Sequence, residues 1–173
     1  MKKKELYGRF DVVGYILSEW RMRAVLPHVT GTLMDLACGD NRLVRKYGSG
    51  TGVDITNYGN VDVLCSDFSS LPFAGGEFDT VTILAALNYF EDPGGVVREI
   101  GRVLKSDGTL LVTFLNQEVS RIWHTVKEKH TTPRPAFSEA ELALYLQGAH
   151  LRVIEKKTFM LGLNTIYFIK KQS

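Results

Sequence analysis

The sequence predicts an α/β fold, in which a mostly parallel β-sheet carries helices on both faces. Two observations lead to this prediction. Short apolar runs alternate along the chain with segments of helical periodicity, and right-handed crossovers bring each such helix back over the sheet. The chain of 173 residues also shows neither an internal repeat nor a low-complexity linker. We therefore expect one domain over residues 1–173, long enough to bury a substantial core.

The N-terminal half is predicted to run helix, strand, helix, strand, strand. Residues 12–26 have the periodicity of an opening helix, and GTLMDLA (31–37) is a compact apolar strand. The next segment, 40–48, is helical in character and ends at a glycine, the residue type favoured just beyond a helix C-terminus. Two further strands are predicted at 51–56 and 61–66, separated by a turn-rich stretch.

The middle of the chain contains the longest predicted strand and the most regular predicted helix. FDTVTILAAL (78–87) is the longest apolar strand candidate. In residues 93–105 the apolar side chains fall on one helical face, with Pro93 in the first turn, where its missing N–H is tolerated. Residues 106–108 are predicted to end this helix, and residues 109–115 to form a fifth, buried strand.

The pattern changes toward the C-terminus. Apolar residues at helical spacing in 119–126 indicate a helix, and two prolines in 131–137 indicate a surface loop. Ser138 and Glu141 have the spacing of a capping box, so another helix is expected to begin there. Residues 151–171 then have the pattern of an antiparallel hairpin, which we expect at the sheet edge.

The composition argues against several classes of protein. A formal net charge of only +2 gives no reason to expect nucleic acid as a partner. Cys38 and Cys65 are the only cysteines, too few for a disulfide framework or a cysteine-based zinc site, which favours a reducing, cytoplasmic setting. No apolar run approaches the length of a membrane span, and the lysines at 2–4 are expected to form a solvated tail rather than a signal peptide.

The ends of the first two predicted strands carry acidic residues. In an open parallel sheet, ligands bind beyond the carboxyl ends of the strands, where residues 35–40 and Asp54 are expected to lie. A dinucleotide site would need G-x-G-x-x-G, but Gly39 is the only glycine between residues 33 and 47, and a P-loop is also missing. A carboxylate at the end of the second strand can accept hydrogen bonds from ribose hydroxyls. The pattern thus predicts a nucleoside ligand without a phosphate bridge.

Three segments resemble, in order and spacing, the motifs of the class I S-adenosylmethionine-dependent methyltransferases, in particular their small-molecule branch. MDLACGD resembles the family's first motif, TGVDIT its acidic second strand, and residues 65–114 its middle section. The resemblance is close over residues 31–115. It implies a Rossmann-like fold whose seven-stranded sheet ends in a reversed strand, in agreement with the predicted hairpin. It also implies S-adenosylmethionine as cofactor and S-adenosylhomocysteine as product.

The resemblance also implies which residues contact the cofactor. Asp35 would organise a loop whose backbone approaches the methionine part, and Asp54 would hold the ribose. Ile55 would lie against the adenine, Asp67 would meet the adenine amino group, and Ala85 would present its carbonyl toward the cofactor amine. The complete expected set is Asp35, Ala37, Cys38, Gly39, Asp54, Ile55, Asp67, Phe68 and Ala85.

One departure from the family pattern bears on the loop. The family usually has glycine at both ends of the first motif, where this chain has Ala37 and Asn41. Asparagine tolerates the left-handed backbone conformation and alanine is small, so we expect the loop to be retained. Whether the departure weakens cofactor binding stays open.

Structural alternatives exist for several of these residues. Asp35 could simply cap the turn that follows it, and Asp67 could be the first residue of an Asx turn with the serines after it. Cys38 is expected to be a small buried residue of the loop rather than a nucleophile, because no partner base is evident.

The acceptor side of the site is less defined than the cofactor side, and the catalytic residues are unknown. Should the acceptor need to lose a proton, Tyr89, His124 and His130 are the candidate bases. Asn88 and Tyr89 either border the acceptor pocket or pack a loop. Residues 116–137 are predicted to form a mobile cover over the acceptor site.

The leading hypothesis is an enzyme that methylates an unidentified small molecule by direct displacement, which needs no metal. The alternative is a non-catalytic S-adenosylmethionine-binding sensor or partner subunit, suggested by the short chain and the altered glycines. A third possibility, an RNA or protein methyltransferase, predicts lysines and arginines clustered at the pocket mouth. The oligomeric state is left open.

Overall fold

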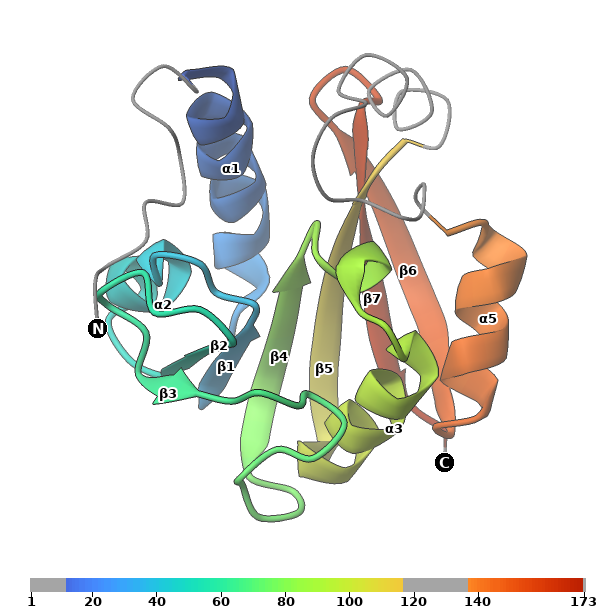
Figure 1. Cartoon of the computed structure of the whole chain (residues 1–173). Coiled ribbons are helices and arrows are strands. Elements are labelled where there is room, and N and C mark those ends of the chain that lie inside the picture. Colours follow the sequence, from blue (N-terminus) through green and yellow to red (C-terminus); the bar gives the residue numbers. More distant parts are fainter. Residues whose placement is uncertain (1–11, 117–136, 173) are drawn as a thin grey trace.

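A computed structural model describes residues 12–116 and 137–172, and these residues form a seven-stranded sheet with helices packed on both faces (Figure 1). The strand order is β3-β2-β1-β4-β5-β7-β6. The strands are β1 Leu33–Leu36, β2 Thr51–Asp54, β3 Val63–Leu64, β4 Phe78–Leu84, β5 Leu104–Leu115, β6 Leu151–Phe159 and β7 Asn164–Lys171. The helices are α1 Val12–Val25, η1 Leu26–His28, α2 Arg42–Tyr47, η2 Leu87–Tyr89, α3 Pro93–Val103 and α5 Glu139–Gln147.

The pairing of the strands confirms the predicted mostly parallel sheet. Strands β3, β2, β1, β4 and β5 are all parallel to their neighbours. Strand β7 is antiparallel to both β5 and β6, because β6 and β7 are joined by a tight turn at Met160–Leu163 that reverses the chain. The Rossmann-like order, with its reversal between β1 and β4, brings the ends of these two strands to the same edge of the sheet.

Each face of the sheet has its own apolar core. On one face, Val97 and Ile100 of α3 and Leu146 of α5 pack with strand residues such as Ile83. On the other face lie residues of α1, η1 and α2, packed with alternate residues of the strands. The buried members of this second core are Met22, Val25, Val29, Leu33, Leu43, Val44, Leu111, Ile166 and Phe168. Because both faces are covered, the central strands are apolar throughout rather than alternating.

Local sequence signals account for most helix ends. The Asp92 side chain accepts a hydrogen bond from Gly95 N at 2.8 Å and caps α3, whose first residue is proline. The capping box of Ser138 and Glu141 is confirmed at the start of α5. Helix α2 ends at Gly48, whose φ of 94° is the left-handed conformation that glycine adopts most easily.

The junction between α3 and β5 differs from the prediction. The helix stops at Val103 and β5 begins at once with Leu104, so the predicted turn at residues 106–108 is wrong. Leu104 is fully buried and pairs with Phe78, and an irregularity in the ladder after that pair absorbs the extra residues. Tertiary pairing has overridden the local turn signal.

Strand β3 is only two residues long, shorter than predicted, because β3 is an edge strand that pairs with β2 alone. The helix expected at 119–126 and most of the loop expected at 131–137 lie outside the described residues. Among residues 12–116 and 137–172, no helix is both long and apolar enough to cross a membrane.

Candidate functional site

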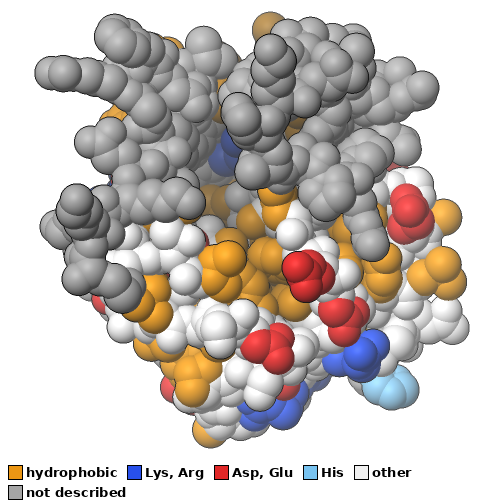
Figure 2. Space-filling view, in the orientation of Figure 1, with side chains coloured by type: hydrophobic (Ala, Val, Ile, Leu, Met, Phe, Trp, Pro, Cys, Tyr) orange, Lys and Arg blue, Asp and Glu red, His pale blue; other side chains and the backbone are white. Residues whose placement is uncertain are grey.

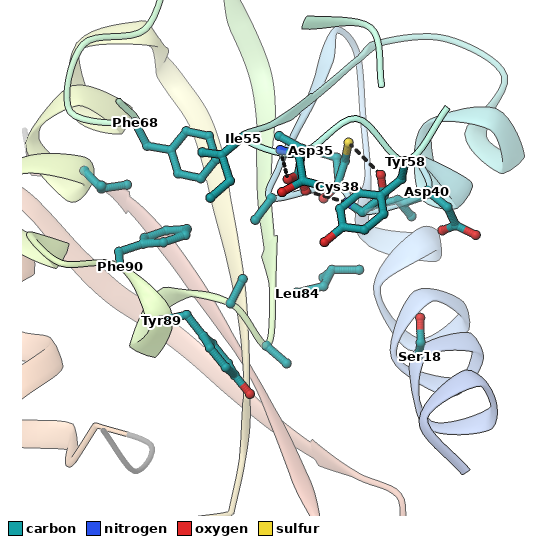
Figure 3. Close-up of a pocket in the computed structure, with 18 of the residues that line it drawn as sticks. Ser18, Asp35, Cys38, Asp40, Ile55, Tyr58, Phe68, Leu84, Tyr89 and Phe90 are labelled. Atoms are coloured by element: carbon teal, nitrogen blue, oxygen red, sulfur yellow. Dashed lines mark hydrogen bonds between the residues drawn. The ribbon is translucent and has the colours of Figure 1, made fainter. Parts of the chain in front are cut away.

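A pocket of about 1160 Å³ opens at the carboxyl ends of β1, β2 and β4 (Figure 3). All nine residues expected to contact the cofactor line it: Asp35, Ala37, Cys38, Gly39, Asp54, Ile55, Asp67, Phe68 and Ala85. Ligand pockets commonly measure about 300–1000 Å³, so there is room for a nucleoside and a second small molecule. The sheet topology explains the convergence, since parallel strands end at the same edge.

The loop after β1 has three left-handed residues at alternate positions. The φ angles are 57° at Ala37, 59° at Gly39 and 60° at Asn41. An L-residue in this conformation costs about 1–2 kcal/mol, which glycine largely avoids. Ala37 and Asn41, which stand where the family pattern has glycine, therefore both adopt a backbone conformation that glycine favours.

The side chain of Asn41 explains how the loop tolerates the missing glycine. Its Nδ2 donates to the carbonyl of Asn60 and to Oδ2 of Asp62, both at 2.8 Å. The same Asp62 oxygen accepts from Gly52 N at 2.8 Å. These bonds tie the loop to the segment before β3 and to β2. This network was not predicted from the sequence; the only local signal for it is an aspartate, Asp62, that follows a turn.

The position of the Asn41 amide also favours glycine at residue 52. A Cβ at Gly52 would overlap the amide group of Asn41. We expect Gly52→Ala to lower the free energy of unfolding by about 1–3 kcal/mol, the usual cost of overpacking. In an Asn41→Gly background the same substitution should cost less, because the obstructing amide is gone. Urea denaturation of the two single variants and the double variant measures the coupling, and strictly additive effects would contradict it.

Asp54 joins the end of β2 to the loop after β1. One carboxylate oxygen accepts from Gly39 N and the other from Thr56 N, each at 2.9 Å. The side chain is buried, at 6% exposure, yet it borders the pocket. Each carboxylate oxygen has two lone pairs, so both can accept a further hydrogen bond from a ligand hydroxyl.

Asp35 lies at the end of β1 beneath the same pocket and is 3% exposed. Its Oδ1 accepts a hydrogen bond from the Thr82 hydroxyl at 2.6 Å. Burial raises the pKa of Asp35 to about 7; the Thr82 bond opposes this rise, and the charges of Asp54 and Asp40 add to it. Asp35 can therefore lose its proton near neutral pH when a cation binds beside it.

Cys38 is positioned by the loop rather than activated in it. Its backbone N donates to the carbonyl of Val53 at 3.1 Å, which fastens β1 to β2. Burial, together with the nearby carboxylates, raises the pKa of the thiol well above its ordinary value. A protonated thiol is a poor nucleophile, in agreement with the structural role predicted for this residue.

The segments that follow β2 and β3 contribute apolar side chains and one carboxylate to the pocket lining. Ile55 is 63% exposed although it is a large apolar residue, and the ring of Phe68 lies edge-on to Phe90 with centroids 5.1 Å apart. Asp67 Oδ1 accepts from the backbone N and the hydroxyl of Ser69 at 2.8 and 2.6 Å, which lowers the pKa of Asp67. The Asx turn considered for Asp67 is thus present, and Asp67 borders the pocket as well.

The end of β4 forms the floor between the two sides of the pocket. Ala85 has a φ of 53°, and its N–H is shared between the carbonyl and the hydroxyl of Thr113. The turn that follows brings Tyr89 to the pocket wall, where it is half-exposed (Figure 3). Asn88 is buried and is absent from the described lining. The other candidate bases, His124 and His130, lie outside the described residues, as does most of the predicted cover at 116–137.

Helix α1 forms one wall of the pocket, which its residue pattern does not predict. Ser18, Arg21 and Met22 line the pocket from this helix, and Figure 3 shows Ser18 across the open space from Phe68 and Phe90. No local pattern in the helix marks these positions, because their role depends on where α1 packs.

The charges that line the pocket are mostly negative. Six acidic side chains and two arginines belong to its described lining, so the basic cluster expected of a nucleic-acid methyltransferase is not found there. Acidic side chains also lie beside the hollow in the space-filling view (Figure 2). S-adenosylmethionine carries positive charges on its sulfur and its amine, so a lining of this sign fits that cofactor.

Fold and pocket together define a Rossmann-like ligand-binding protein, and comparison with known proteins identifies its family. A sequence profile described as a methyltransferase domain matches residues 32–112. A demethylmenaquinone methyltransferase of Corynebacterium kroppenstedtii is 32% identical, over 84% of this chain and 77% of that protein. A SAM-dependent methyltransferase of Thermotoga maritima has the same fold, with a TM-score of 0.79 at 19% identity over 95% of this chain and 93% of that one.

The chain belongs to the class I S-adenosylmethionine-dependent methyltransferases. It also matches an uncharacterized chloroplastic methyltransferase of Arabidopsis thaliana, with 31% identity over 54% of this chain. The match spans 34% of the length of the Arabidopsis protein and 55% of a demethylmenaquinone methyltransferase of Paenarthrobacter aurescens.

Proposed function

We propose that this protein transfers the methyl group of S-adenosylmethionine to a small-molecule acceptor. The observation that carries the proposal is the convergence on one pocket of the nine residues that the family resemblance assigns to the cofactor. Asp35 and Asp54, from adjacent strands, border the same space. Had their side chains pointed to opposite sides of the sheet, no single nucleoside could have met both.

In this proposal the chain's own residues hold and orient the two reactants. Asp54 accepts hydrogen bonds from the ribose hydroxyls, and Ile55 and Phe68 lie against the adenine. The backbone of the loop at Ala37 and Gly39 approaches the methionine part, while the charge of Asp35 attracts its cationic groups. Binding of this kind places donor and acceptor in line and excludes water, which lowers the barrier of a displacement by several kcal/mol.

The proposed reaction is a direct displacement. Bound S-adenosylmethionine supplies a methyl group on a positively charged sulfur. A bond forms between the nucleophilic atom of the acceptor and the methyl carbon, while the carbon–sulfur bond breaks and its electron pair stays on sulfur, giving S-adenosylhomocysteine. Any proton that the acceptor loses passes to a base or to water, and Tyr89 is the described candidate that borders the pocket.

Two observations support a small-molecule acceptor. The described lining is acidic rather than basic, which argues against a polyanionic acceptor. Several relatives are named as methyltransferases of demethylmenaquinone, which is a small molecule. A cytoplasmic location stays a prediction that rests on the cysteine content.

Calorimetry and a transfer assay test the proposal together. We expect S-adenosylhomocysteine to bind the purified protein with one-to-one stoichiometry. We also expect methyl transfer from labelled S-adenosylmethionine to a component of a small-molecule extract. Cofactor binding without transfer to any extract would favour the alternative, a non-catalytic sensor or partner subunit. Absence of cofactor binding would contradict both.

A further inference from the structure

The carboxylate of Asp35 is held by a residue outside the nine expected cofactor contacts. The hydroxyl of Thr82, on the neighbouring strand β4, donates a hydrogen bond of 2.6 Å to Oδ1 of Asp35. Thr82 is fully buried and is absent from the described pocket lining. We propose that Thr82 is a positioning residue, which holds the Asp35 carboxylate toward the cofactor and sets the pH range in which the site binds it. This inference rests on the proposed function, because it concerns the affinity of the same site.

The register of the sheet brings the two side chains together. Asp35 of β1 pairs with Thr82 of β4, and paired residues of neighbouring strands point to the same side of a sheet. Oδ1 of Asp35 is taken by Thr82, whereas Oδ2 receives no hydrogen bond from residues 12–116 and 137–172. Because Asp35 borders the pocket, Oδ2 is the oxygen left for a ligand. A carboxylate already held at one oxygen loses less side-chain entropy when the other oxygen binds.

The Thr82 hydroxyl also has a second, longer contact, with the main-chain carbonyl of Met34 at 3.5 Å. A hydroxyl carries one donor and two acceptor lone pairs. It can donate to the ionised carboxylate of Asp35. When Asp35 is neutral, the same hydroxyl can accept the carboxyl proton and donate to the Met34 carbonyl. Loss of the proton from Asp35 therefore turns the hydroxyl from the carbonyl to the carboxylate, and no buried group is left unpaired in either state.

Thr82 opposes the influences that keep Asp35 protonated. Burial raises the pKa of Asp35 most, and the charges of Asp54 and Asp40 add to the rise, whereas the bond from Thr82 lowers it. The surrounding loops and helices bring further ionisable groups to the same pocket: Cys38, Arg21, Arg42, Tyr58, Asp67 and Tyr89. All of these groups stay in place when only the Thr82 hydroxyl is removed, so a substitution at this position isolates the effect of one hydrogen bond.

Titration of the free protein tests whether Thr82 controls Asp35. Carbon NMR of the protein labelled at its aspartate carboxyl groups follows the ionisation, and Asp35→Asn assigns the signal. We expect a midpoint of about 7 in the wild type. Thr82→Val keeps the shape of the side chain without the hydroxyl, and its midpoint should lie about one to two pH units higher, the shift that a hydrogen bond to a charged group produces. Thr82→Ser, which keeps the hydroxyl, should titrate like the wild type.

Calorimetry with S-adenosylhomocysteine between pH 6 and pH 9 tests whether this control reaches the cofactor. The affinity of the wild type should rise with pH and level off above the midpoint of Asp35. In Thr82→Val the levelling-off should move upward by the same amount as the NMR midpoint, so that the variant binds about five- to fiftyfold more weakly at pH 7. A hydroxyl with a merely structural role would instead change the affinity by the same factor at every pH.

Thr80→Val is the matched control on the same strand. Thr80 is fully buried, lies outside the described lining, and donates to the carbonyl of Thr30 at 2.7 Å. Its loss should lower the stability but leave the pH profile of binding where the wild type has it, which also accounts for any titration of the ligand. Should Thr82→Val fail to fold, Thr82→Cys, whose thiol is a weaker donor, should shift both midpoints in the same direction by a smaller amount.

The possible failures can be told apart. An unchanged midpoint of Asp35 in the folded Thr82 variants refutes the inference while cofactor binding stands. A midpoint that moves without a matching change in the pH profile of binding also refutes it, because Thr82 then acts on Asp35 but not on the cofactor. If S-adenosylhomocysteine does not bind the wild type at any pH, the proposed function fails, and this inference fails with it.

Discussion

Replacement of Asp54 by alanine is expected to weaken the binding of S-adenosylhomocysteine about a hundredfold or more. The carboxylate is buried at the end of β2, and each of its oxygens already accepts one backbone hydrogen bond from Gly39 or Thr56. Two ribose hydroxyls would each add a hydrogen bond to a charged acceptor, worth about 1.5–3 kcal/mol apiece. The alanine variant loses these bonds and also leaves the Gly39 N–H without its acceptor, so the loop itself loosens.

Calorimetry with a matched control tests this expectation. Glu139→Gln removes an exposed carboxylate on α5 that pairs with Lys156 and lies outside the described lining, so its affinity should equal that of the wild type. Asp54→Asn keeps the shape of the side chain but turns one acceptor into a donor, and it should bind nearly as poorly as the alanine variant. Unchanged affinity in Asp54→Ala would refute the assignment of the ribose to this residue.

Replacement of Asp35 by asparagine is expected to stabilise the protein at pH 8 while weakening the cofactor. A carboxyl whose pKa rises from 3.8 to about 7 on folding destabilises the folded state by roughly 4 kcal/mol once it is ionised. The folded protein keeps a proton that the unfolded chain releases, so the free energy of unfolding falls as the pH rises from about 4 to about 7. The asparagine variant lacks this loss and can still accept the Thr82 hydrogen bond.

Urea denaturation between pH 4 and pH 8 measures this effect. Asp79 provides a control of opposite sign, because bonds from Lys105 and Thr32 lower its pKa to about 2. Its contribution is present above pH 4 and is lost as the pH falls through 2, so Asp79→Asn should destabilise the protein at pH 8. Equal stability of Asp35→Asn and the wild type at pH 8 would show that folding does not raise the pKa of Asp35.

The same titration should appear in cofactor binding. At pH 6 the free protein holds a proton on Asp35, which must leave before the carboxylate can attract the positive charges of S-adenosylmethionine. We therefore expect the affinity of the wild type to increase from pH 6 to pH 8, and the affinity of Asp35→Asn to be low and flat over this range. A flat profile in the wild type would separate Asp35 from cofactor binding.

Much of the architecture was accessible from the order of residues alone. Strand and helix positions, the parallel sheet and the C-terminal hairpin follow from periodicity, from glycine and proline punctuation and from capping residues such as Ser138, which are signals between near neighbours. Asp35 and Asp54 were predicted as site residues for a related reason, since each follows an apolar run and the carboxyl ends of parallel strands meet at one edge of the sheet.

Only the packed fold decided the features that join distant parts of the chain. Asn41 replaces a glycine successfully because Asp62, Asn60 and Gly52 surround it, and β5 begins at Leu104 because Phe78 is there to pair with it. Arg21 reaches the pocket wall through a bond to Asn164, 143 positions away in the chain. Burial depths, charge environments and long-range contacts are properties of neighbours in space, which local patterns of residues do not encode.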